Sequence, residues 1–136
     1  MANIKIVYSG DLRTEATHLQ SGEVIVTDAP VDNKGKGENF SPTDLFATSL
    51  GSCMLTIMGI AANTHGLDIR GSTINIKKIM DKNPRRVSSL EIIINIKGTL
   101  NAMDKKILIK AAENCPVSKS INPSINETIT FNFVGV

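Results

Sequence analysis

Residues 45–64, with the sequence LFATSLGSCMLTIMGIAANT, decide the fold of this chain. They contain no charged residue over about the length that spans a lipid bilayer. Polar side chains nevertheless lie inside the stretch, at Thr48, Ser49, Ser52, Thr56 and Asn63. Lys and Arg do not flank it closely, as they do at the ends of many membrane spans. We therefore predict a buried central helix and no membrane partner.

Both ends of this helix carry recognisable signals. Ser41 can cap the first turn, Pro42 suits the first helical position, and Asp44 completes a capping box three residues after the cap. Gly66 is a natural stop, so the helix is expected to run from Ser41 to about His65.

Strands are expected on both sides of the central helix. Alternating apolar residues and turn signals predict three strands before it, a loop, and a hairpin after it that turns at residues 82–85. The ranges are 2–8, 11–18 and 23–27 for the strands, 29–40 for the loop, and 70–80 and 87–97 for the hairpin.

The last part of the chain adds a second helix and a last strand. Residues 101–114 are amphipathic at helical spacing, with Met103, Ile107, Leu108 and Ala111 on one side. A short helical piece begins at Cys115-Pro116, and residues 127–134 alternate as a strand. We predict one α+β domain over residues 1–136, with mainly antiparallel pairing.

Composition excludes several classes of function. The net charge of +2 and the aromatic content of 4% argue against a nucleic-acid partner. Two His and two Cys, without paired ligand spacing, predict no metal site. Residues 1–8 alternate like a strand and lack the apolar core of an export signal, so we expect a cytoplasmic protein with reduced cysteines.

Cys53 lies in the middle of the apolar helix. On a helical wheel Ser49, Ser52, Thr56 and Asn63 fall within about 100° to one side of it. Cys53 therefore borders a stripe of small polar side chains, either as a reactive thiol or as a core thiol beside small residues.

Cys115 lies directly before Pro116, near the start of a helix. The helix dipole and the free N–H groups there favour a thiolate, and Lys119 one turn later can add to this effect. The alternative is a plain residue of the N-terminal cap. Judged by local sequence alone, Cys115 is the better activated of the two thiols.

Two motifs resemble the signatures of the OsmC/Ohr family, the osmotically inducible and organic-hydroperoxide-resistance proteins. Residues 41–53, SPTDLFATSLGSC, resemble the first signature, and residues 113–118, ENCPVS, resemble the second. The turn-rich segment Gly35-Lys36-Gly37 before the first motif, the chain length and the order of elements are also similar to the family.

The resemblance implies curved antiparallel sheets around two central helices in an intertwined homodimer. It also implies that organic hydroperoxides are reduced by Cys53 as the attacking thiol and Cys115 as the resolving thiol. An external dithiol reductant would then reduce the disulfide, and no cofactor is expected.

The chain departs from the family peroxidases at one pair of residues. Where they carry a Glu after the Pro of the first motif, paired with an Arg of the preceding loop, this chain has Thr43 and no Arg in residues 29–40. Arg13 is the only Arg before the helix and is our candidate for the cation that activates Cys53.

These observations predict a thiol-dependent hydroperoxide reductase. The alternative is a non-catalytic dimer of the same fold that binds a small apolar or acyl ligand in a pocket at the interface.

Overall fold

The computed structural model of the chain describes residues 1–135. Its packing groups the residues into two compact units, Met1–Phe46 and a second that starts at Ala47. A single domain over residues 1–136 stays a prediction.

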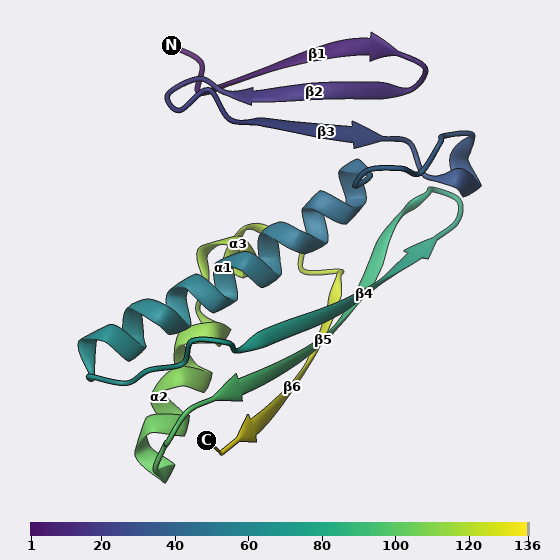
Figure 1. Ribbon diagram of the computed structural model, residues 1–136. Coiled ribbons are helices and arrows are strands. Elements are labelled where there is room, and N and C mark those ends of the chain that lie inside the picture. The colour runs from purple at the N-terminus through teal and green to yellow at the C-terminus, as the bar shows by residue number, and fades with distance from the viewer. Residues whose placement is uncertain (136) are drawn as a thin grey trace. The chain divides into compact units, whose positions relative to one another are not determined.

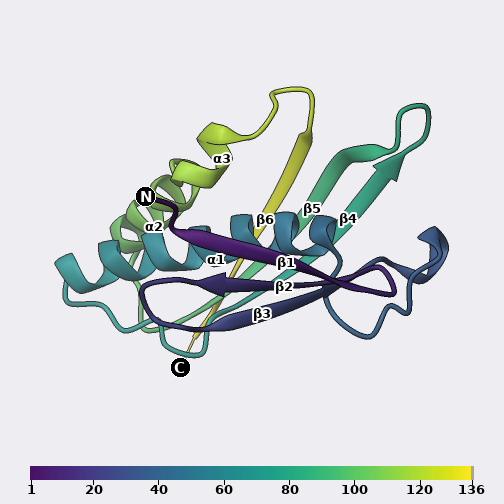
Figure 2. The same ribbon diagram turned by 90° about the horizontal axis from the view of Figure 1, so that it is seen from above.

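The first unit contains a three-stranded antiparallel sheet in the order β1-β2-β3 (Figure 2). Its strands are β1 (Ile4–Gly10), β2 (Arg13–His18) and β3 (Val24–Asp28). Asp11 and Leu12 join β1 to β2, and both have positive φ angles. The three predicted strands are thus confirmed, each beginning one or two residues later than the sequence indicated.

The loop after β3 folds back onto the end of that strand. It contains a short 3-10 helix, η1 (Val31–Asn33). The Asp28 carboxylate accepts hydrogen bonds from the backbone N–H groups of Glu38 and Asn39, at 3.2 and 3.0 Å. At Gly35, a Cβ atom would lie 1.7 Å from the carbonyl oxygen of Ala29, so only glycine fits. The loop is therefore tied to its own unit.

The central helix, α1 (Pro42–Thr64), begins and ends where the sequence predicts. The Ser41 hydroxyl accepts from the Asp44 N–H, and the Asp44 carboxylate accepts from the Ser41 N–H, both at 3.0 Å. This is the predicted capping box. Gly66 follows with a φ of 66°, and Leu67 N–H bonds back to the Ala62 carbonyl at 2.8 Å, which ends the helix.

The second unit contains a sheet in the order β4-β5-β6 beside the helices (Figure 1). The strands β4 (Thr73–Asp81) and β5 (Arg86–Lys97) form the predicted hairpin, and β6 (Asn126–Val134) completes the sheet. The helices α2 (Ala102–Glu113) and α3 (Pro116–Ser120) lie between β5 and β6 in sequence.

One pairing differs from the expected antiparallel sheets, because β6 runs parallel to β5. The intervening segment with α2 and α3 returns the chain to the end of the sheet where β5 starts. Parallel neighbours require such a crossover, whereas a tight turn would have given antiparallel strands.

Both long helices pack on the same face of this sheet. A Cβ at Gly51 of α1 would lie 2.7 Å from Ile76 Cδ1 on β4, and Lys105 of α2 lies 5.3 Å from the centre of the Phe133 ring on β6. On β5 the buried residues alternate and share this face; they are Leu90, Ile92, Ile94 and Ile96. In α2, Leu108 and Ala112 are buried, whereas Met103, in the first turn, is 63% exposed in the single chain.

By length and composition, α1 is the one helix among residues 1–135 that could cross a membrane. The core helices of soluble proteins pass the same test. Leu50, Met54 and Met58 are fully buried along one side of α1. These contacts agree with the predicted central helix.

Candidate functional site

The structure brings the two cysteines together from distant parts of the sequence. Cys53 lies in α1 and is half-buried, and Cys115 directly precedes α3 and is completely buried. Both are free thiols, and Cys53 lies close enough to Cys115 to raise the pKa of its thiol. Two neighbouring thiols can interconvert between a dithiol and a disulfide.

The packing of α1 places Cys53 at the margin of the core. Leu50 and Met54, close to it in the helix, are buried, whereas Ser49, Ser52 and Thr56 are exposed. The predicted stripe of small polar side chains is therefore present and open in the single chain. It leaves the Cys53 thiol partly accessible to small molecules.

The local sequence explains how Cys115 is held. Its backbone is extended, with φ −68° and ψ 141°, and Pro116 occupies the first helical position. The Cys115 sulfur accepts a hydrogen bond from the Ser118 N–H at 3.3 Å. The sulfur thus takes the place of the oxygen with which serine caps a helix.

The expectation that the start of α3 favours a Cys115 thiolate is wrong. Burial raises the pKa of the Cys115 thiol, and the neighbouring Cys53 and Glu127 raise it further, while the Ser118 N–H bond lowers it by less. The prediction failed because it counted the helix N-terminus but not the loss of water around the sulfur. Lys119 is exposed to solvent.

Sequence reasoning did not identify Glu127 as part of this site. Its carboxylate accepts the Ser118 hydroxyl, with Oγ at 3.0 Å from Oε1 and 3.1 Å from Oε2. A signal was present, because Glu127 takes the register position that Ile129, Phe131 and Phe133 continue along β6. An acidic residue in an otherwise apolar alternation is unusual enough to mark a site.

Arg13 is part of an ion-pair network within the first unit. Its Nε lies 2.6 Å from Asp28 Oδ1, and its Nη2 lies 3.0 Å from both Asp28 Oδ2 and Glu38 Oε1. Asp28 raises the pKa of Arg13, and Arg13 lowers the pKa of Asp28 to about 2. Arg13 is thus bound by acidic partners of its own unit rather than by solvent alone. Its action on Cys53, which belongs to the second unit, stays a prediction.

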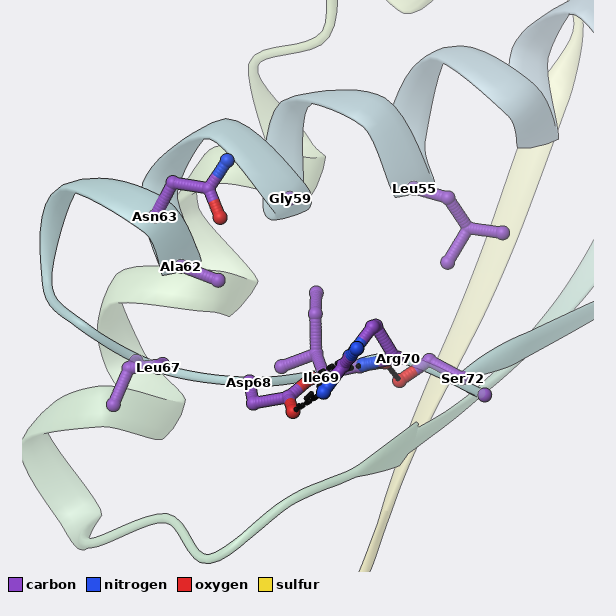
Figure 3. Close-up of a pocket in the computed structure, with 10 residues that line it drawn as sticks. Leu55, Gly59, Ala62, Asn63, Leu67, Asp68, Ile69, Arg70 and Ser72 are labelled. Carbon is purple, nitrogen blue, oxygen red and sulfur yellow. Dashed lines mark hydrogen bonds and ion pairs between the residues drawn. The ribbon is translucent and has the colours of Figure 1, made fainter.

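A separate cavity of about 490 Å³ lies between the C-terminal half of α1 and the loop after it (Figure 3). Leu55, Gly59 and Ala62 form its helical wall, and Ile69 points into it from the loop. Arg70 and Asp68 pair at 2.7 Å along the loop. The lining residues do not include Cys53 or Cys115.

Within residues 1–135, no three His, Cys, Asp or Glu side chains gather closely enough to hold a metal ion. His18 is exposed and its Nδ1 lies 2.6 Å from the Ser21 hydroxyl, and His65 is exposed at the end of α1.

Residues 35–130, which include both cysteines, match the model of the family of OsmC-like proteins. The chain belongs to the OsmC-like family. A crystal structure from Psychrobacter arcticus 273-4, of a candidate osmotic stress induced and detoxification response protein, is 52% identical to this OsmC-like chain. The two structures superpose with a TM-score of 0.93, and the match covers 97% of this chain and 96% of the Psychrobacter chain.

Two more distant structures share the OsmC-like fold. The organic hydroperoxide resistance protein OsmC of Legionella pneumophila is 18% identical, with a TM-score of 0.70 over 95% of this chain and 94% of that one. The organic hydroperoxide resistance protein of Elizabethkingia anophelis is 16% identical, with a TM-score of 0.69 over 98% of each chain.

One relative of the chain is a much longer protein. The flagellar motor switch phosphatase FliY of Bacillus subtilis (strain 168) is 31% identical over 114 residues. These residues are 84% of this chain but only 28% of FliY, so the chain spans less than a third of that protein.

Proposed function

We propose that this OsmC-like protein reduces organic hydroperoxides through Cys53 and Cys115, with an external dithiol as reductant. The observation that carries the proposal is the proximity of the two free thiols, which come from distant parts of the sequence. The family supports it, as does the description of the Legionella and Elizabethkingia proteins as organic hydroperoxide resistance proteins.

The reaction cycle balances with a hydroperoxide, the two cysteines and a dithiol reductant. The Cys53 thiolate attacks one peroxide oxygen, the O–O bond breaks, and the alkoxide leaves as an alcohol after taking up a proton. Cys53 becomes a sulfenic acid. Cys115 then attacks the Cys53 sulfur, a disulfide forms, and the hydroxide leaves as water. The dithiol returns both cysteines to thiols by exchange and is itself oxidised.

Exposure and charge support Cys53 as the attacking thiol. Cys53 is half-buried and accessible, whereas Cys115 is completely buried and its pKa is raised. A buried thiol with a raised pKa is a poor first nucleophile. It can still act as the resolving thiol, because it lies beside its target.

An exposed apolar sheet face supports assembly as a homodimer. Ile4, Ile6 and Tyr8 of β1 share one face with Ile25 of β3, and all four side chains are more than half exposed. A patch of this kind on a single chain is typical of an interface. We propose that a second copy of the chain covers it, and that the dimer acts in the cytoplasm, where thiol reductants are available.

One titration tests the proposed reaction. Reduced protein is treated with one equivalent of cumene hydroperoxide per chain, and free thiols and intact mass are measured. We expect both thiols to disappear and the mass to fall by two hydrogens. Unchanged thiols and mass under excess peroxide would refute a peroxidase.

A second candidate function is the binding of a small apolar or acyl ligand. The cavity beside α1 favours it, because its volume of about 490 Å³ is that of small-molecule sites and its helical wall is apolar. Retention of a fatty-acid probe by a chain that is inert to peroxide would favour this function.

A further inference from the structure

Glu127 occupies a position where a carboxylate loses part of its hydration, which costs free energy. It pairs with Leu90 of β5 and shares the helix-facing register of β6 with Ile129 and Phe131. Turning an acidic side chain toward an apolar layer costs free energy unless a partner binds the carboxylate. A solvent-facing register position was available at Thr128, one residue later. We therefore expect a partner that binds the Glu127 carboxylate and offsets this cost.

The partner is Ser118, in the first turn of α3. The Ser118 hydroxyl donates to both oxygens of Glu127, at 3.0 and 3.1 Å. The N–H of the same serine donates to the Cys115 sulfur at 3.3 Å. Ser118 is thus held on one side by β6 and binds Cys115 on the other, and Cys115 lies near Cys53 of α1.

We propose that Glu127 is a positioning residue which, through Ser118, holds Cys115 in place as the resolving partner of Cys53. This inference rests on the proposed function. Hydrogen bonds to an ionised carboxylate are stronger than those between neutral groups, so Glu127 fixes the Ser118 side chain. The fixed serine in turn sets the direction of the Cys115 sulfur.

The charge of Glu127 also acts on the Cys115 thiol itself. The groups that face Cys115 are Cys53 from α1, Glu127 from β6 and the Ser118 N–H from α3, while Lys119 on α3 and Glu113 at the end of α2 are exposed. Burial raises the pKa of the Cys115 thiol most, and the neighbouring Cys53 and Glu127 raise it further. Removing the charge of Glu127 should therefore lower the pKa of Cys115.

Ellman's reagent separates the two steps without any peroxide. Attack by Cys53 releases one thionitrobenzoate and leaves a mixed disulfide, and attack by Cys115 on that disulfide releases the second. We expect Ser118→Ala and Glu127→Ala to leave the first release unchanged and to slow the second about tenfold. A loss of that size corresponds to one hydrogen bond to a charged group. Glu113→Gln, which changes an exposed carboxylate near Cys115, is the control and should alter neither release.

Glu127→Gln tests the charge separately from the hydrogen bond, because glutamine has the same shape and its oxygen can still accept from Ser118. In a Cys53→Ser background, this substitution should shift the pH profile of Cys115 alkylation to lower pH, whereas Ser118→Ala should not. A loss of structure alone would not produce this difference. Glu127→Asp should restore part of the second release that Glu127→Ala loses.

The inference is overturned if the second release is as fast in Ser118→Ala and Glu127→Ala as in the parent, or if Glu127→Gln leaves the alkylation profile unchanged. The proposed peroxidase fails on a different measurement, the mass of the parent after peroxide. A parent that is inert to peroxide but shows the effects of Glu127 would retain the positioning role for thiol–disulfide exchange.

Discussion

The contact between α1 and β4 predicts different responses to alanine at two glycines of one helix. A Cβ at Gly51 would lie 2.7 Å from Ile76 Cδ1 and 3.3 Å from Ile74 Cγ2, whereas a Cβ at Gly59 meets nothing within 4 Å. Both substitutions gain the same helix propensity, about 1 kcal/mol. They differ only in what the new methyl group touches.

The structure sets the size of this difference. Carbon atoms pack at about 3.5–4.0 Å, so Ile76 Cδ1 must retreat by roughly 1 Å in Gly51→Ala. Overpacking of this kind costs about 1–3 kcal/mol, and the lower half of that range applies because Cδ1 is the free end of a side chain. We expect Gly59→Ala to stabilise the chain by about 1 kcal/mol, with Gly51→Ala less stable than Gly59→Ala by about 1–2 kcal/mol.

Urea denaturation measures both variants, with equal protein concentrations because assembly adds to apparent stability. Equal stabilisation by the two substitutions would refute the close contact between α1 and β4. Since Cys53 follows Gly51 by half a turn, the Ellman release of its thiol reports in the same samples whether the helix has moved.

Four further predictions concern the first unit, the assembly and the thiols. The pKa of Asp28 is lowered from about 3.8 to about 2, so its ion pair with Arg13 stabilises the fold fully above pH 4 and loses this effect as the pH falls toward 2. Urea denaturation of Asp28→Asn at several pH values should show that this part of the pH dependence of stability is gone. Arg13→Met should lose the same stability, and only a slower alkylation of Cys53 at neutral pH would support its predicted activating role. Light scattering should give twice the chain mass of 14.6 kDa, and a folded single-chain species at micromolar concentration would contradict the homodimer. Cys115→Ser treated with hydroperoxide should gain one oxygen on Cys53 rather than lose two hydrogens, as intact mass would show.

Local signals along the chain determined the helices and strands of this protein. The capping box of Ser41 and Asp44 and the stop at Gly66 gave the limits of α1 to within a residue. The alternation and turn signals gave the strands to within about three residues. These features are set by neighbours in sequence, through backbone hydrogen bonds and side-chain periodicity. The two motifs around Cys53 and Cys115 likewise sufficed to identify the family.

Only the tertiary structure decided how these elements meet. The parallel placement of β6 depends on where the crossover through α2 and α3 returns, and no residue of β6 encodes that by itself. It is this placement that brings Glu127 to Ser118, and through Ser118 to Cys115. The raised pKa of Cys115 has the same origin, because desolvation depends on every element packed around the sulfur, whereas the sequence displays only the turn that follows it.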